Sequence, residues 1–192
     1  MSIFDAAVEV CTFLEDNHIP YAVLGGLALQ HWGEPRTTQD VDIVVLVPSD
    51  QEDNLLQAIL QRFHPRMADA LSFAKQYRML LVRTSSDVPV DIALGIPGYE
   101  EQALERAAKV SFHGLPPINI LSAEDLIIHK CVAGRPRDIE DVERVLLRQR
   151  AKLDLRYVRN WLRQFAEIIE AHDPRAIFAD ALKKVRGRLP PK

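Results

Sequence analysis

The sequence predicts an α+β fold, with a mixed β-sheet core over residues 1–121 and a helical subdomain over residues 122–192. Two observations support this division. Short runs of β-branched residues, separated by turn residues, fill the first part. From Ser122 onward the apolar residues recur at helical spacing instead. A chain of 192 residues suits one compact domain, or a core with a helical extension.

Proline, glycine and apolar spacing define the elements expected in the core. Ser2 is a typical N-terminal cap for a first helix, and Pro20 interrupts the chain before the first strand. Residues 84–87 are turn formers between two β-branched runs, which indicates a hairpin. We expect helices over residues 3–16, 27–32, 48–63 and 99–108, and strands over residues 21–24, 40–47, 77–83, 88–94, 110–112 and 118–121.

Capping residues define four helices in the subdomain. Ser122 begins a capping box that has Asp125 in place of glutamate, and Gly134 is suited to end that first helix. The further helices are expected over residues 137–149, 155–171 and 174–186, the last with Gly187 just after its end. We expect the closing residues 190–192 to fray.

The charge is divided unevenly along the chain. Residues 1–121 hold 8 Lys and Arg against 16 Asp and Glu, whereas residues 122–192 hold 16 against 11. An acidic first part agrees with a cation site, and a basic second part can help to hold polyphosphate or RNA. The alternative is that these charges belong to solvated helix faces.

The composition excludes several classes of protein. With 47% apolar and 27% charged residues, the chain is typical of a globular protein, and no apolar run approaches the ~20 residues that span a bilayer. The N-terminus lacks the basic region of a signal peptide. Cys11 and Cys131 are far apart and the histidines form no metal-binding pair, so we expect reduced, buried thiols, no zinc site and a cytoplasmic location.

The most informative segment is residues 21–46. An apolar run ends at Gly25-Gly26, and Asp40-Val41-Asp42 opens the next run after thirteen intervening residues. Because strand side chains alternate, Asp40 and Asp42 project from the same side, where they repel unless a cation lies between them. The glycines leave backbone N–H groups open to a phosphate at the start of a helix. Together these features predict a site for a metal-bound nucleoside triphosphate.

This pattern resembles the signature of the nucleotidyltransferase superfamily, which includes polymerase beta. The signature has a third carboxylate on a later strand, and Asp91 fits that position. The chain is most similar to small bacterial members that resemble the nucleotidyltransferase toxins of abortive-infection systems. The residues that match them are Gly25, Gly26, Ala28, Arg36, Thr38, Asp40 and Asp42.

A second segment also resembles those relatives. It contains Asp125 and Lys130, followed by Arg135 and Asp138, with Arg137 in place of the family's lysine. The resemblance covers roughly residues 6–147. One departure is Leu27, which stands where Ser or Thr often follows the glycines.

The resemblance implies an Mg²⁺-dependent reaction with two ions, for which Mn²⁺ is the alternative metal. Asp40 and Asp42 would bind both ions, and Asp91 would bind the ion nearest the attacking hydroxyl and accept its proton. A nucleoside monophosphate would pass from a nucleoside triphosphate such as ATP to an acceptor hydroxyl, with release of pyrophosphate. The acceptors considered are the 3′ end of tRNA or another RNA, a protein and a small molecule. The residues expected to bind the nucleotide are Gly25, Gly26, Arg36, Thr38 and Lys130.

Three of these residues have alternative interpretations. The planar guanidinium of Arg36 suits a phosphate and Thr38 can bond the nucleotide, but both residues can instead be solvated loop residues, with a local Thr turn. Lys130 lies on the apolar stripe of its helix, so it either binds the triphosphate or pairs with a carboxylate, Asp138 or Asp141.

Other polar and aromatic residues are expected to pack rather than to bind. His31, Trp32 and His129 are interpreted as partly buried packing groups, and the aromatic set on the third subdomain helix as helix core. That set is Tyr157, Trp161 and Phe165. The alternative function is a non-catalytic module of the same fold, such as an antitoxin or a nucleotide sensor. The missing hydroxyl at Leu27 favours it slightly, and the three aspartates argue against it. A weaker alternative is an RNA-binding adaptor that uses the basic helices.

Overall fold

The computed structural model describes residues 2–188, and it divides into two compact units. The first unit contains residues 2–27 and 37–121, and the second contains residues 28–36 and 122–188. The predicted fraying of residues 190–192 lies outside the described residues.

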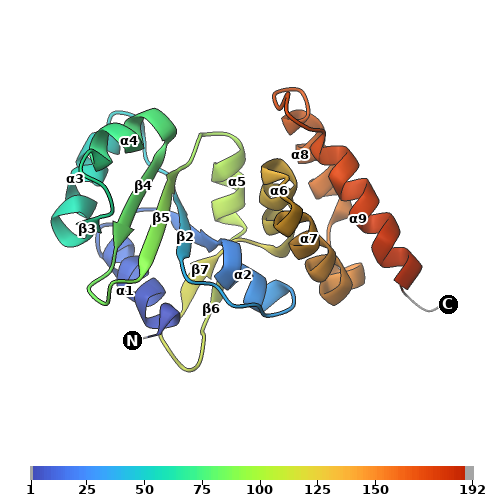
Figure 1. Cartoon of the computed structure of the whole chain (residues 1–192), viewed down its shortest axis with the longest axis horizontal. Helices are drawn as coiled ribbons and strands as arrows, with labels where there is room; N and C mark the ends of the chain where they lie inside the picture. Colours follow the sequence, from blue (N-terminus) through green and yellow to red (C-terminus); the bar gives the residue numbers. More distant parts are fainter. Residues whose placement is uncertain (1, 189–192) are drawn as a thin grey trace. The chain divides into compact units, whose positions relative to one another are not determined.

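The first unit is built on a mixed seven-stranded sheet, as the α+β prediction requires. Its strands are β1 (Tyr21–Leu24), β2 (Val41–Val45), β3 (His64–Pro65), β4 (Met79–Arg83), β5 (Pro89–Leu94), β6 (Ala108–Val110) and β7 (Ile118–Ile120). Their order is β3-β4-β5-β2-β1-β7-β6, with β2 beside β5 in the middle (Figure 1). The pairs β2–β5 and β1–β7 are parallel and the others are antiparallel, including the predicted hairpin β4–β5.

Alternating burial along β4 and β5 separates a buried face from a more exposed one. On β5, Val90, Ile92 and Leu94 are buried, whereas Asp91 lies on the opposite, more exposed face. On β2, Val41 is buried, and the neighbouring Asp42 is only half-buried. The apolar face forms the core because it removes β-branched side chains from water. Asp42 and Asp91 therefore lie on the same face of the sheet, and neither is buried.

Four helices belong entirely to this unit: α1 (Ile3–Asp16), α3 (Glu52–Arg62), α4 (Ala70–Tyr77) and α5 (Tyr99–Glu105). Helix α1 packs on β1, β2 and β7, while α4 packs on β4 and contacts α3 (Figure 1). The N-terminal cap predicted at Ser2 is present, since its side chain accepts from the backbone N–H of Asp5; the Asp5 carboxylate accepts from the Ser2 backbone N–H in return, which completes a capping box. Another helix, α2 (Gly25–Trp32), starts in the first unit, and its residues from 28 onward belong to the second.

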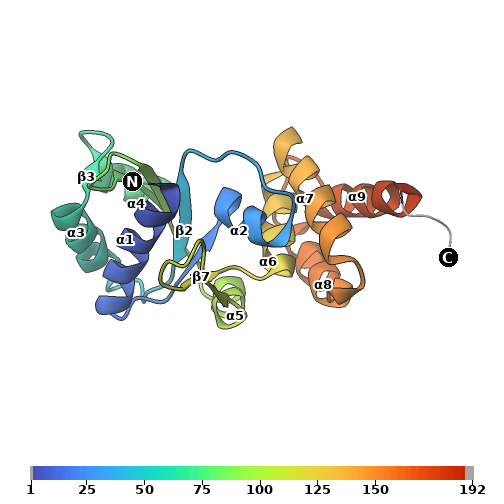
Figure 2. The same cartoon turned by 90° about the horizontal axis from the view of Figure 1, so that it is seen from below.

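The second unit is a group of helices, shown in yellow to red in Figure 2. They are α6 (Ala123–Ala133), α7 (Pro136–Gln149), α8 (Leu155–Phe165) and α9 (Pro174–Arg188), with a short 3-10 turn at Arg150–Lys152. Helix α6 contacts the other three, and α9 also contacts α7 and α8. Pro174 opens α9 as predicted, and Gly134 ends α6 with a positive φ of 64°.

Several predicted boundaries are wrong. The helix after the first strand begins at Gly25 rather than at residue 27, so both glycines lie in its first turn. Strand β2 ends at Val45, before Pro48, which has no N–H to donate to a neighbouring strand. Helix α8 ends at Phe165, where the chain tightens into i to i−3 bonds such as Ile168 N–H to Phe165 C=O. Gly187 does not end α9, which continues to Arg188.

One strand and one helix of the first unit were not predicted. The two-residue strand β3 is too short to leave a periodic pattern, and α4 has only eight residues. Tyr77, predicted to begin a strand, instead ends α4, and Arg78 follows it in a left-handed conformation with φ 53°. The turn at Arg78 therefore separates α4 from β4 where the sequence predicted a longer strand.

Both cysteines are buried and free, as predicted. Burial raises the pKa of Cys11 to about 12 and that of Cys131 to about 12, so neither thiol is a ready nucleophile at neutral pH. Among residues 2–188, no helix combines the length and the apolar character needed to cross a bilayer.

Ser122 and Asp125 form a buried cap at the start of α6. The Ser122 Oγ accepts from the Asp125 N–H at 3.1 Å and donates to the Asp125 carboxylate at 2.5 Å. The other carboxylate oxygen accepts from the Tyr157 hydroxyl on α8 at 2.8 Å. The cap thus links the start of α6 to α8, and it explains why Asp125 is fully buried.

We predict that Ser122→Ala lowers the free energy of unfolding by roughly 1–3 kcal/mol, because Asp125 loses a donor in a buried site and the helix loses its cap. The matched control is Ser2→Ala, which removes an exposed cap of the same type from α1. It is expected to cost only about 0.5–1 kcal/mol. Urea denaturation measures both variants, and equal losses would show that burial of the α6 cap adds nothing.

Candidate metal and nucleotide site

Strand register brings three aspartates together in the first unit. Asp42 on β2 lies directly opposite Asp91 on the parallel strand β5, so their side chains project from the same face. Asp40 lies just before β2, two residues from Asp42. One ligand atom from each of the three carboxylates lies within 4.8 Å of the others, and none of the three residues is buried.

Thr38 orients Asp40 at the edge of this cluster. Its hydroxyl donates to the Asp40 Oδ1 at 2.9 Å and lies 3.3 Å from the Asp40 carbonyl oxygen. These bonds order the loop before β2 and include a local Thr turn, which is one of the interpretations given above. Its contact with a nucleotide stays a prediction.

The two glycines allow the start of α2 to approach this loop and strand closely. Gly25 has a φ of +62°, and a Cβ there would lie 1.8 Å from the Asp42 Oδ2. A Cβ on Gly26 would lie 2.4 Å from the Thr38 Oγ1. A side chain at either position would therefore displace a residue of the cluster or of its loop, which is a steric requirement separate from phosphate binding.

Arg66, which the sequence analysis missed, provides a cation at the cluster. It follows β3, and its Nη1 donates a short hydrogen bond to the Asp91 Oδ1. Both side chains are partly exposed, at 29% and 26%. The pair offsets part of the repulsion among the three carboxylates. No sequence signal marks Arg66, because its position depends on the pairing of β3 with β4.

The ligand set fits a hard divalent cation. All three side chains offer carboxylate oxygens, which Mg²⁺ and Mn²⁺ prefer, and the set contains no thiolate or imidazole that would favour zinc. Magnesium is usually held by one or two carboxylates together with substrate phosphates and water, and a partly exposed cluster leaves room for those.

In the second unit, Lys130 lies between two buried carboxylates. Its Nζ is 2.7 Å from the Asp138 Oδ1 and 3.0 Å from the Asp141 Oδ2, and the lysine side chain is only 10% exposed. Although burial raises the pKa of Asp138, hydrogen bonds from Lys130 and Arg135 outweigh it and hold that pKa below its usual range. The structural pair left open by the sequence is thus present, and the phosphate role of Lys130 stays a prediction.

Arg36 joins the same group of charges. Its Nε and Nη2 each donate to Asp141 at 3.1 Å, one to each carboxylate oxygen. Arg144 also approaches Asp141, at 3.5 Å. Arg36 is therefore not a solvated loop residue, since its side chain is 16% exposed and held in a bidentate pair. Its contact with phosphate remains a prediction.

The remaining candidates behave largely as packing groups. Burial lowers the pKa of His129 to about 4, so its ring is neutral at pH 7. The rings of His31 and Trp32 contact each other edge to face at 4.3 Å. The predicted aromatic helix core is wrong: α8 buries Val158 and Leu162, whereas Tyr157, Trp161 and Phe165 are only half-buried. The ring centroids of Trp161 and Phe165 are 6.2 Å apart, and the Tyr157 hydroxyl donates to Asp125.

Comparisons with known families and structures agree with this geometry. The family described as Nucleotidyltransferase of unknown function (DUF6036) matches residues 1–180. No curated protein is significantly similar in sequence.

Two solved structures have a similar fold. An antigenic nucleotidyltransferase-like protein from Paracoccidioides brasiliensis has a TM-score of 0.51 at 18% identity, with 93% of this chain and 90% of that chain covered. The antibiotic-resistance factor ANT(2'')-Ia has a TM-score of 0.54 at 14% identity, with 96% and 95% covered. At such low identity these similarities support the fold alone.

We predict that Arg66→Met raises the affinity for Mg²⁺ in the absence of nucleotide by about three- to tenfold, because a competing positive charge is removed from Asp91. Isothermal titration calorimetry measures the change. The control is Arg62→Met, which removes a cation paired with Glu9 instead. Unchanged or weaker Mg²⁺ binding by the Arg66 variant would show that the pair does not oppose the metal.

We also predict that Lys130→Met destabilises the metal-free protein by roughly 2–4 kcal/mol at neutral pH, since Asp138 and Asp141 lose a buried cation. The matched control is Arg135→Met, which removes a 75% exposed partner of the same Asp138. Because solvent screens this exposed pair, we expect the control to lower the free energy of unfolding by only about 1 kcal/mol or less. Urea denaturation provides the comparison, and equal stability of the two variants would argue against a structural role for Lys130.

Proposed function

The chain belongs to the nucleotidyltransferase family of unknown function (DUF6036), and on this premise we propose that it transfers a nucleoside monophosphate from a nucleoside triphosphate to an acceptor hydroxyl, with Mg²⁺. The observation that carries the proposal is the cluster of Asp40, Asp42 and Asp91, with ligand atoms within 4.8 Å of one another. Such a cluster suits two-metal chemistry, which needs carboxylates that can be shared between ions.

The aspartates have distinct roles in this proposal. Asp40 and Asp42 would each ligate both ions, and Thr38 would keep the Asp40 carboxylate oriented toward them. Asp91 would ligate the ion on the acceptor side and accept the proton of the attacking hydroxyl. When bound, two Mg²⁺ ions supply electrostatic stabilisation of the attacking and leaving oxygens. Arg66 would release Asp91 as the ions bind, because one carboxylate oxygen cannot serve both cations equally well.

The nucleotide is expected to lie against the start of α2. Gly26 lies in the first turn of α2, where backbone N–H groups and the helix dipole favour an anion. For Arg36 and Lys130, a phosphate-binding role rests on the resemblance described above, and carboxylates of the second unit hold both side chains in place. A planar guanidinium and an ammonium are both groups that bind phosphate.

The acceptor is proposed only as a hydroxyl compound. One structure of ANT(2'')-Ia, with a TM-score of 0.51 and 14% identity, is a complex with adenylyl-2''-tobramycin, and it covers 92% of this chain and 97% of that chain. That neighbour supports a small-molecule acceptor as one candidate, beside an RNA 3′ end and a protein. A place in a toxin–antitoxin pair also stays a prediction.

The experiment that tests this function incubates the purified protein with each α-labelled nucleoside triphosphate, Mg²⁺ and one of three acceptor pools: total RNA, protein extract or hydroxyl-bearing small molecules. We expect label in one pool, lost with Asp91→Asn. If no pool is labelled while Mg²⁺-triphosphate still binds, the protein is instead a nucleotide-binding module of the same fold. If no triphosphate binds, both functions are excluded.

We predict that Asp40→Asn/Asp42→Asn weakens Mg²⁺-dependent triphosphate binding by about 100-fold or more, because most of the ligand charge is lost. The metal-free double variant is expected to melt at the same temperature or higher, since mutual repulsion is relieved. The control is Asp50→Asn/Asp53→Asn, which removes two exposed carboxylates elsewhere in the same unit. Calorimetry and thermal melts measure both pairs, and wild-type affinity in the first variant would remove these aspartates from the site.

A further inference from the structure

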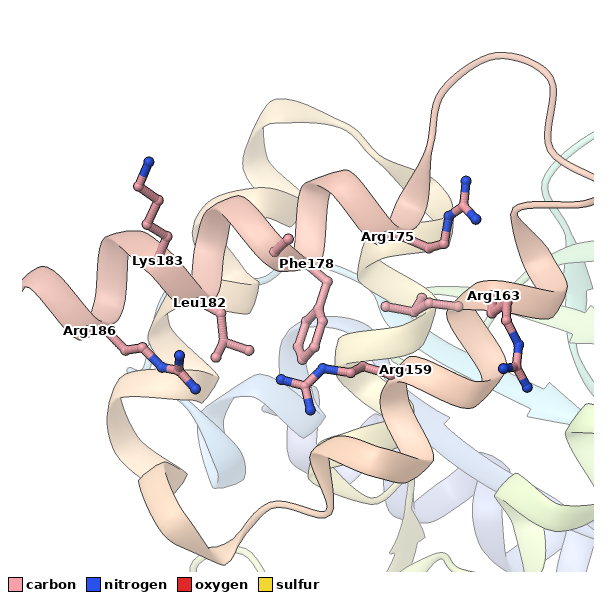
Figure 3. Close-up of a pocket in the computed structure, with 9 residues that line it drawn as sticks. Arg159, Arg163, Arg175, Phe178, Leu182, Lys183 and Arg186 are labelled. Carbon is pink, nitrogen blue, oxygen red and sulfur yellow. The ribbon is translucent and has the colours of Figure 1, made fainter.

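A groove of about 610 Å³ lies between α8 and α9 in the second unit (Figure 3). Its apolar lining includes Leu162 from α8 and Phe178 and Leu182 from α9. Figure 3 shows Phe178 and Leu182 pointing from α9 toward α8, where the side chain of Arg159 lies. Residues 175–186 of α9 line the groove over roughly 16 Å, about three helical turns.

Cations surround this apolar floor. The lining contains Arg159, Arg163, Arg175, Lys183 and Arg186, and no acidic residue. Arg175 is paired with Asp173 at 2.9 Å, and Arg163 donates to the neutral Asn160 at 2.8 Å. Within residues 2–188, Arg159 and Arg186 form no salt bridge, so their charge is uncompensated.

The other side of α9 shows the opposite arrangement. Lys184 and Arg188 pair with the buried Glu143 of α7, at 2.6 and 3.2 Å. The basic residues that pack against the unit are thus paired with a carboxylate, whereas Arg159 and Arg186, which line the groove, form no salt bridge within residues 2–188. This asymmetry identifies the groove as a surface that lacks an anionic partner.

We propose that the groove binds an acidic amphipathic helix of a partner protein. Apolar side chains of that helix, spaced at i, i+3 or i+4, and i+7, would pack on Ala179 and Leu182, the apolar lining residues of α9 that are not buried, and carboxylates on its flanks would pair with Arg159 and Arg186. The length of the groove matches about three turns of such a helix. Arginine is enriched at protein interfaces because it combines an apolar stem with a directional charge.

The lining favours a protein over a nucleic acid. Binding of single-stranded RNA depends on exposed aromatic rings that stack on bases, whereas Phe178 is only 3% exposed. Phosphates gain nothing from an apolar floor, while the apolar face of a helix is stabilised there. The proposal involves the second unit alone and stands apart from the carboxylate cluster and its chemistry.

The test uses a synthetic peptide of about 16 residues, with leucines at helical spacing and glutamates on both flanks. A scrambled peptide of the same composition keeps the charge but removes the apolar face. Fluorescence anisotropy at about 50 mM salt compares both peptides and a 12-nucleotide oligouridylate. We expect the amphipathic peptide to bind about tenfold or more tightly than its scrambled form.

The protein variant is Arg159→Glu/Arg186→Glu, which reverses one charge on each helix. We expect it to weaken binding of the amphipathic peptide by about tenfold or more, while the melting temperature and the Mg²⁺ affinity stay unchanged. The control Lys109→Glu/Lys152→Glu makes the same change in net charge at two exposed positions outside the groove. Three results would each overturn the proposal: no binding of the amphipathic peptide, equal binding of the scrambled peptide, or tighter groove-dependent binding of oligouridylate.

Discussion

The fold of the first unit holds three carboxylates close together although their like charges repel one another. In-register pairing of β2 and β5 places Asp42 beside Asp91, and the loop before β2 adds Asp40. Hydrophobic burial of the opposite face holds this arrangement, because slipping either strand by one residue would turn its aspartate into the core and an apolar side chain out of it. The folding energy of the sheet thus keeps the carboxylates together, and Arg66 offsets part of the cost.

The second unit contains a buried network of opposite charges. Asp141 is fully buried and accepts from Arg36 while Lys130 and Arg144 lie within 4.0 Å, so its charge is more than compensated. A buried network of this kind adds little net stability over apolar packing, but it penalises any arrangement in which one charge is left alone. The network therefore specifies how residues 28–36 join α6 and α7 within this unit.

The sequence predicted the sheet-forming runs and the three aspartates because strand alternation makes a charged residue in an apolar run conspicuous. It also predicted the caps at Ser2, Ser122 and Gly134, which depend on a few neighbouring residues. It did not predict Arg66, whose partner is 25 residues away, or the Arg36–Asp141 pair, which spans 105 residues. Contacts of that range depend on the tertiary fold, and short elements such as β3 leave no periodic signal.

The close approach of Gly26 to Thr38 has an evolutionary consequence. Gly26 has an ordinary backbone conformation, so contact rather than strain restricts this position: the three atoms nearest to a new Cβ belong to the Thr38 side chain, and the Thr38 Cβ lies 2.5 Å away. The two positions are therefore epistatic: a larger residue at 26 becomes acceptable only after 38 has lost its side chain. That first loss would leave Asp40 without its hydroxyl donor. Any substitution of Gly26 therefore has to follow a loss at position 38, which weakens the aspartate cluster. As long as selection maintains the aspartates, it also maintains Gly26 and Thr38.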